Sequence, residues 1–143
     1  MTTNLTRASL EGIMPFFIVG RLQTALDFYV QQLGFSVDVA IPEDGPFFAI
    51  VSRDRVSLML KEIAKEIQPL PNHTRHGWAR WDAFVYTPDP DGLYEELRQK
   101  NVHFHQPLAD TGDGLRAFEI FDSDGYVLCF GRRIKDEIRA QQA

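Results

Sequence analysis

The sequence predicts an α+β fold built from two βαβββ modules, and three observations support this prediction. Strand-like and helix-like hydrophobic patterns occur twice along the chain in the same order. Leu26 and Leu93 occupy equivalent positions in the two predicted helices, and the apolar pattern of residues 54–60 returns in residues 124–130. The length of 143 residues and the hydrophobic content of 44% suit one compact domain with a substantial core. We therefore expect residues 1–143 to form a single domain.

The first module spans about residues 12–61 and follows a polar arm. An apolar run rich in strand formers is followed by apolar residues at helical spacing, and Gly34 ends that helix. Three further strand patterns are separated by turns that are rich in charged residues and glycine. The predicted elements are an arm over 1–11, a strand over 13–19, a helix over 22–33 and strands over 35–40, 47–51 and 56–60.

Residues 62–79 are predicted to connect the modules. The segment 62–67 has the composition of one or two helical turns, and Pro69, Pro71 and Gly77 then interrupt any regular element.

The second module, about residues 80–132, repeats the order of the first. Asp89 is a suitable N-cap because Pro90 follows it at the first helical position. The predicted elements are a strand over 81–87, a helix from 90 that includes Leu93, Tyr94 and Leu97, a strand starting at 102–104, a loop over 110–114, strands over 115–121 and 126–130, and a charged tail from Arg132 that is helical or frayed.

Charge and composition exclude several classes of partner. The formal net charge of −5 disfavours nucleic acid, which requires clustered Lys and Arg. No apolar run is long enough for a membrane span, and no segment has the pattern of a signal peptide. Cys129 is the single cysteine, so an intramolecular disulfide is impossible. We expect a cytoplasmic protein that binds neither nucleic acid nor membranes.

Two short motifs resemble the vicinal oxygen chelate (glyoxalase/bleomycin resistance/dioxygenase) superfamily. Residues 26–35, LDFYVQQLGF, are similar to the helix of that family, and residues 121–126, FDSDGY, resemble its closing turn. Both motifs stand in the correct order within the duplicated pattern, and the resemblance covers roughly residues 12–132. It implies cup-shaped mixed sheets with the helices outside. It also implies a homodimer, because family members commonly complete their cups across two chains.

The resemblance places the family's metal-binding positions on residues that are poor ligands. Enzymes of the family hold a divalent metal with His, Gln or Glu, and those positions fall on Met14, Met59, Asp82 and Cys129. Only Asp82 is a hard ligand, and one carboxylate does not hold a catalytic metal. We expect no metal and no cofactor, as in the metal-free, bleomycin-resistance-like members.

Two other groups of residues have a metal-binding alternative. Met14, Met59 and Cys129 could together hold copper(I), but filling apolar space is the more common use of such side chains. His103 and His105 share a face if they lie on a regular strand, and this spacing can chelate zinc. Their position near Pro107 favours a solvated pair instead.

The favoured prediction is a non-catalytic small-molecule-binding protein, similar to those that sequester drugs or antibiotics. The sequence contains eleven Phe, and the metal-free relatives use aromatic residues on the strand that corresponds to Phe84 and Tyr86. The ligand would be a small aromatic or cationic molecule. The predicted ligand-binding residues are Met14, Phe16, Met59, Trp81, Asp82, Phe84, Tyr86 and Cys129.

Asp82 is the acidic residue in this otherwise apolar set, and its role depends on its partner. A guanidinium from Arg80 or Arg116 would make it structural, whereas a hydrated carboxylate would await a cationic ligand.

Two alternative functions remain open. One is a metal-dependent lyase or extradiol-type dioxygenase with displaced ligands drawn from His73, His76, Asp82 and Glu119. The other is a structural or regulatory dimer whose cup is filled by its own side chains. Bound metal would favour the enzyme, and a fully packed cup would favour the structural dimer.

Overall fold

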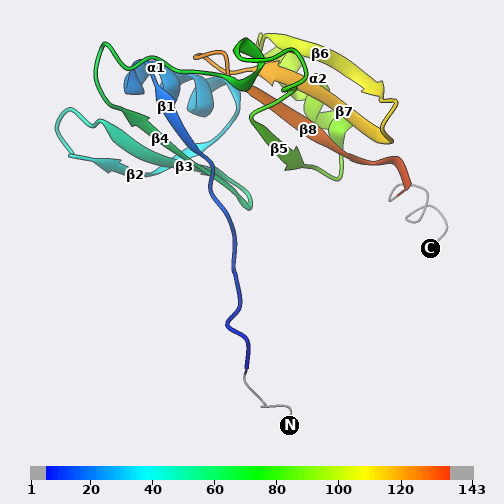
Figure 1. Ribbon diagram of the computed structural model, residues 1–143, viewed down its shortest axis with the longest axis horizontal. Helices are drawn as coiled ribbons and strands as arrows, with labels where there is room; N and C mark the ends of the chain where they lie inside the picture. The colour runs from blue at the N-terminus through cyan, green and yellow to red at the C-terminus, as the bar shows by residue number, and fades with distance from the viewer. Residues whose placement is uncertain (1–5, 136–143) are drawn as a thin grey trace.

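The computed structural model describes residues 6–135 and confirms the α+β fold of two βαβββ modules (Figure 1). Module one is built from strands β1–β4, and the two modules lie side by side. Its elements are β1 (Phe16–Val19), α1 (Leu22–Asp27), a π-helical segment (Phe28–Gln32), β2 (Ser36–Ile41), β3 (Phe48–Arg53) and β4 (Val56–Glu62).

Module two is built from strands β5–β8 and has the same element order. A short 3₁₀ turn, Asn72–Thr74, lies in the segment between the modules. The elements of module two are β5 (Ala83–Tyr86), α2 (Pro90–Gln99), β6 (Phe104–Asp110), β7 (Leu115–Phe121) and β8 (Val127–Arg133).

Both sheets have the same mixed topology. The strand order is β1-β4-β3-β2 in module one and β5-β8-β7-β6 in module two. The first strand of each module pairs in parallel with the last, and the other pairs are antiparallel. The first two strands of each module lie at opposite edges of the sheet. The helix that connects them therefore crosses one face of that sheet.

Each sheet therefore has a face that packs on a helix and a face without one, which we call the open face. Successive side chains of a strand point to opposite faces. In β1, Phe17 and Val19 are buried toward the helix, whereas Phe16 is 51% exposed on the open face. This alternation follows directly from the strand pattern in the sequence.

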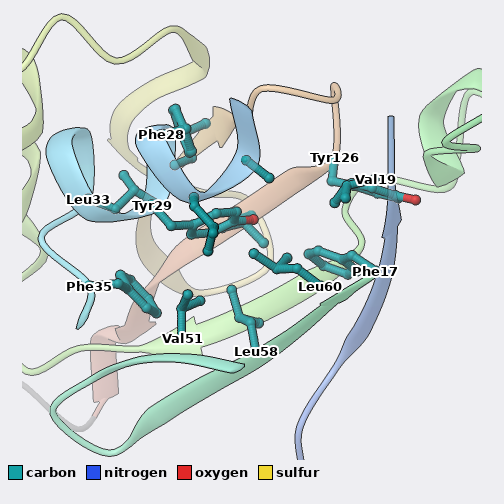
Figure 2. Close-up of a cluster of buried hydrophobic side chains, with 14 of the residues drawn as sticks. Phe17, Val19, Phe28, Tyr29, Leu33, Phe35, Val51, Leu58, Leu60 and Tyr126 are labelled. Atoms are coloured by element: carbon teal, nitrogen blue, oxygen red, sulfur yellow. The ribbon is translucent and has the colours of Figure 1, made fainter. Parts of the chain in front are cut away.

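The helix-facing layers of the two modules share one core. Tyr126 of module two stacks on Phe17 with 4.4 Å between ring centroids, and its hydroxyl donates to the carbonyl of Ile18. The Tyr29 hydroxyl donates to the Asp122 carboxylate at 2.7 Å. Figure 2 shows side chains of α1 and the π-helical segment above those of the sheet, with Tyr126 at one end. The closing turn of module two is therefore an integral part of the core of module one.

Local signals set both helix boundaries as the sequence predicts. Gly34 has φ of +76°, a conformation that glycine adopts without strain, and the helix of module one ends there. The Asp89 side chain accepts from the backbone N–H of Gly92, and Pro90 is the first residue of α2.

Several predicted boundaries were wrong because sheet pairing decides where a strand ends. The first strand starts at Phe16, not at residue 13. Of the one or two helical turns predicted over 62–67, a single turn is present, in which Ile67 donates its backbone N–H to Ala64, because Glu62 still belongs to β4 and donates its backbone N–H to Phe47. β6 continues into the predicted loop as far as Asp110, and β8 continues to Arg133, which pairs with Leu115. Part of the predicted arm, 1–5, and part of the predicted tail, 136–143, lie outside the described residues.

The described part of the arm, residues 6–15, forms no helix or strand and extends away from the modules (Figure 1). Leu10 and Ile13 are almost fully exposed on it. No helix among residues 6–135 is long and apolar enough to cross a membrane.

Candidate functional site

The open face of module two carries three aromatic side chains in contact, Trp81, Phe84 and Tyr86, which we call the aromatic row. The ring centroids of Trp81 and Phe84 are 5.7 Å apart, and those of Phe84 and Tyr86 are 4.9 Å apart. Ala83 and Val85 pack toward the core, so alternation along β5 places Phe84 and Tyr86 on the open face. Tyr86 is 65% exposed. The row presents flat apolar surface that a planar molecule could cover.

A cavity of about 460 Å³, which we call the polar cavity, lies on the same face beside this row. Cys129 lines it and is the register partner of Phe84, so the cavity begins next to the row. The other lining residues are His73, Gly77, Ala79, Arg80, His105, Gln106, Pro107, Ala109, Thr111, Ala117, Phe118 and Glu119.

Glu119 is the central polar group of this cavity. It lies on β7 and is only 6% exposed. One carboxylate oxygen accepts from Nδ1 of His105 at 2.8 Å, and the other is 3.7 Å from the Arg80 guanidinium. Arg80 also pairs with Asp113 at 2.7 Å. The buried carboxylate is thereby compensated, as a charge in such a site must be.

Two imidazole rings stand together at the cavity. The rings of His73 and His105 are 5.9 Å apart. His73 donates through Nε2 to the carbonyl of Gly125, since a carbonyl oxygen can only accept. By the same argument His105 donates through Nδ1 to the Glu119 carboxylate. The other nitrogen of each ring, Nδ1 of His73 and Nε2 of His105, has no hydrogen-bond partner among residues 6–135.

The thiol of Cys129 is a poor nucleophile. Burial, together with the nearby Glu119 carboxylate, raises the pKa of Cys129 to about 12. The thiol therefore stays protonated at neutral pH, and no nucleophile is available at this position.

Asp82 has a structural role, because both of its carboxylate oxygens accept hydrogen bonds from the backbone. One carboxylate oxygen accepts from the backbone N–H of Asn72 at 2.9 Å, and the other accepts from Val127 at 2.8 Å. The sequence analysis considered a guanidinium partner or a hydrated carboxylate, and the structure has two backbone donors. Asp82 therefore no longer supplies an argument for a cationic ligand.

The remaining predicted ligand-binding residues lie on the other sheet. Phe16 and Met59 are register partners on the open face of module one, and Met14 precedes β1. The polar cavity is lined by residues 73–129 alone, so these three side chains do not join it within one chain. Met14 and Met59 are accordingly not brought together with Cys129.

The metal-binding positions that the family implies do not fit a metal here. Both oxygens of Asp82 are engaged by backbone amides, Met59 lies on the sheet of module one, Met14 precedes that sheet, and Cys129 lies on β8 of module two. Within residues 6–135 no group of three or more His, Cys, Asp or Glu is placed to hold a metal ion.

The displaced ligand set of the alternative enzyme is not assembled either. Nδ1 of His76 accepts from the backbone N–H of Trp78, and Trp78 is almost fully exposed. His76 does not line the cavity that contains His73 and Glu119.

Sequence reasoning misplaced His105, which was expected to form a solvated pair with His103. The pairing of β6 with β7 shifts register between Phe104 and Gln106, and His105 at this irregularity reaches the Glu119 carboxylate. His103 is exposed, whereas His105 lines the cavity. Glu119 carried a usable signal, because a lone charge inside an apolar strand requires a buried partner.

A second cavity, of about 710 Å³, lies between the β3–β4 turn of module one and α2 of module two. Its main charged groups satisfy each other, because Arg53 donates to both carboxylate oxygens of Glu96 at 2.8 and 3.0 Å. We favour the smaller cavity as the functional one because it contains polar nitrogens without a partner.

Comparison with known proteins shows the same fold. A bleomycin-binding protein from bleomycin-producing Streptomyces verticillus, complexed with copper(II)-bleomycin, is 22% identical with a TM-score of 0.64, over 87% of this chain and 97% of that one. TnmS3, an antibiotic binding protein from Streptomyces sp. CB03234, is 20% identical with a TM-score of 0.63, over 88% and 99%. A glyoxalase-related enzyme from Clostridium phytofermentans is 16% identical with a TM-score of 0.68, over 89% and 98%.

These identities establish the fold and leave the ligand open, since binding proteins and an enzyme share it. No curated protein matches the chain. The family model described as Glyoxalase/Bleomycin resistance protein/Dioxygenase superfamily matches residues 12–130. Because this match covers both modules, the chain belongs to that superfamily.

Proposed function

We propose that this protein binds a small, partly aromatic molecule on the open face of module two without transforming it. The observation that carries the proposal is the uncovered aromatic row of Trp81, Phe84 and Tyr86 beside the polar cavity. Tyr86 is exposed, whereas Trp81 and Phe84 are half-buried, and a planar ligand would bury their remaining accessible surface by stacking on it. Structural relatives whose names state that they bind bleomycin or an antibiotic support this class of ligand.

We further propose a homodimer in which two chains complete each cup. The two open faces carry exposed apolar residues, such as Phe16 on module one and Tyr86 on module two, and they do not cover each other within one chain. Facing module one of one protomer against module two of its partner would bring Met14, Phe16 and Met59 to the aromatic row. A twofold dimer would then contain two equivalent cups.

The aromatic row can be tested with 1-methoxy-4-nitronaphthalene, a planar probe without an acidic proton. Trp78→Phe first leaves Trp81 as the single reporter, since the chain has two tryptophans. In this background we expect the probe to quench Trp81 and Phe84→Ser to weaken binding about fivefold, because a stacked ring contributes about 1 kcal/mol. Calorimetry provides a second readout.

The matched control is Val30→Ser, which removes an exposed apolar side chain from the outer surface of the π-helical segment. It should leave the affinity unchanged. Equal probe affinity in Phe84→Ser, Tyr86→Ser and their parent would exclude the aromatic row as the binding site.

The composite cup makes a specific prediction for mixed dimers. Phe16→Ser and Phe84→Ser each damage every cup of their own homodimer. A mixed dimer contains one cup with both defects and one intact cup, so co-refolding the two variants should restore about a quarter of the high-affinity sites. Light scattering coupled to size exclusion verifies the dimer, and calorimetry counts the sites. A monomer, or the absence of restored sites in verified mixed dimers, would contradict the shared cup.

A further inference from the structure

We propose that the polar cavity receives an acidic hydroxyl group of the ligand, whose O–H donates to Nε2 of His105. The ligand class is then a planar aromatic molecule with a phenol-type hydroxyl, its ring on the aromatic row and its oxygen in the cavity. This inference rests on the proposed function and specifies the chemistry that the site recognises.

The tautomer of His105 provides the first argument. A carboxylate has no proton to donate, so the 2.8 Å contact with Glu119 places the ring proton on Nδ1. When the ring is neutral, Nε2 is its acceptor, and this nitrogen is directed away from that carboxylate. No group among residues 6–135 donates to Nε2, so it is available to a ligand. A hydrogen-bond acceptor at the wall of a cavity favours a ligand that carries a hydrogen-bond donor.

The rigidity of the pair provides the second argument. Glu119 is 6% exposed within β7, and it holds the His105 ring in one orientation. The ring also packs edge-on against Phe121 at 4.8 Å between centroids. A fixed imidazole loses little conformational freedom when a ligand binds, so its hydrogen bond contributes more to affinity.

The surrounding charges favour a neutral hydroxyl that can transfer its proton. If the proton moves from the ligand oxygen to Nε2, the resulting imidazolium is paired with Glu119 and the anionic oxygen can be stabilised by Arg80. This transfer moves one proton from oxygen to nitrogen and changes no other bond. The titratable groups around His105 in this cavity are Glu119 on β7, His73 in the connector, Arg80 before β5, Cys129 on β8 and, through Arg80, Asp113 of the β6–β7 turn.

Other ligand chemistries fit less well. A ligand cation would meet the Arg80 guanidinium, and a phosphate or carboxylate would meet the lone pair of His105 and the carboxylate of Glu119. An apolar group would leave Nε2 without a partner in a desolvated site.

Arg80 connects the polar cavity to the aromatic row. Its guanidinium lies over the Trp81 ring, 4.4 Å from the centroid, and Trp81 contacts Phe84. A ring stacked on the row can therefore place a substituent near Arg80 and His105 without leaving the open face.

The experiment compares 1-naphthol, which is protonated at neutral pH, with its methyl ether, 1-methoxynaphthalene, in the wild-type protein. The two probes share the ring, but only the naphthol has an O–H, and its absorption moves to longer wavelength when that group ionises. We expect the naphthol to bind about tenfold more tightly, as one hydrogen bond of about 1.4 kcal/mol would give. We also expect the absorption of the naphthol to move to longer wavelength on binding, because its O–H donates to Nε2.

His105→Phe keeps a ring of similar shape beside Phe121 and removes both nitrogens. We expect it to abolish the difference between the two probes and the spectral shift, while the methyl ether binds as before. His103→Phe is the matched control, because His103 is exposed on the same segment outside the cavity, and it should retain both effects. Thermal melts verify that both variants fold.

The outcomes separate this inference from the proposed function. Equal affinity for the two probes in the wild type, with no change in the naphthol absorption on binding, would overturn the hydroxyl site and leave aromatic binding intact. Binding of neither probe would overturn both. Because the comparison of probes uses the wild-type chain, it remains decisive even if His105→Phe does not fold.

Discussion

Asp122→Ala is expected to reduce the free energy of unfolding by about 3–5 kcal/mol. One Asp122 oxygen accepts from the buried Tyr29 hydroxyl, and the other accepts from the backbone N–H groups of Asp124 and Tyr126. Alanine leaves all three donors unpaired at the junction of the two modules. Chemical denaturation at pH 7 measures the loss, which corresponds to about 3 °C of melting temperature per kcal/mol.

Asp122→Asn is the matched control, because the amide can retain these contacts. Its oxygen can accept from both backbone groups, and its NH₂ can donate to Tyr29 once that hydroxyl rotates. A loss in the asparagine variant as large as that in the alanine variant would mean that the charge, and not the hydrogen bonds, stabilises the junction.

The same pair of proteins gives a pH signature. Burial raises the pKa of Asp122 to about 6, above the ordinary value of an aspartate, so the folded state binds the proton more tightly than the unfolded chain. Stability from this group should therefore increase as the pH falls from about 6 toward 4, by about 2–3 kcal/mol in total. The wild type should gain this stability relative to Asp122→Asn, and parallel pH profiles would contradict the assignment.

Asp82→Ala is expected to cost about 2–4 kcal/mol, because it removes the acceptors of two backbone donors. The connector would lose its anchor at Asn72, and β8 would lose an anchor at Val127. Thermal and denaturant unfolding measure this loss. Asp38→Ala, at an exposed aspartate of β2, is the control and should change stability by less than about 0.5 kcal/mol.

Asparagine should distinguish the two aspartates. At Asp82 the backbone donors approach different oxygens, so the NH₂ of a substituted asparagine would face one of them, and we expect about half of the alanine loss. At Asp122 both backbone donors approach the same oxygen, so asparagine should be tolerated. Full stability of Asp82→Asn together with weaker probe binding would return Asp82 to the ligand site.

The sequence by itself determined the fold, because the relevant signals are local. The alternation of buried and exposed residues in β1 and β4, the helix stop at Gly34 and the cap at Asp89 each depend on a few neighbouring residues. Their repetition fixed two βαβββ modules. Alternation along β5 also assigned Phe84 and Tyr86 correctly to the same face.

Only the tertiary structure decided how the polar groups are paired. His105 lies at the register shift in β6 and reaches Glu119 on β7. Asp82 accepts from the backbone of Val127, and Asp122 accepts from the hydroxyl of Tyr29. Both partners come from distant segments, and a sequence pattern of side chains contains no information about them. Hydrophobic periodicity selects the face on which a residue lies, whereas the partner of a buried charge depends on the three-dimensional packing of the strands. The sequence therefore predicted the aromatic half of the candidate site, and the fold added its polar half.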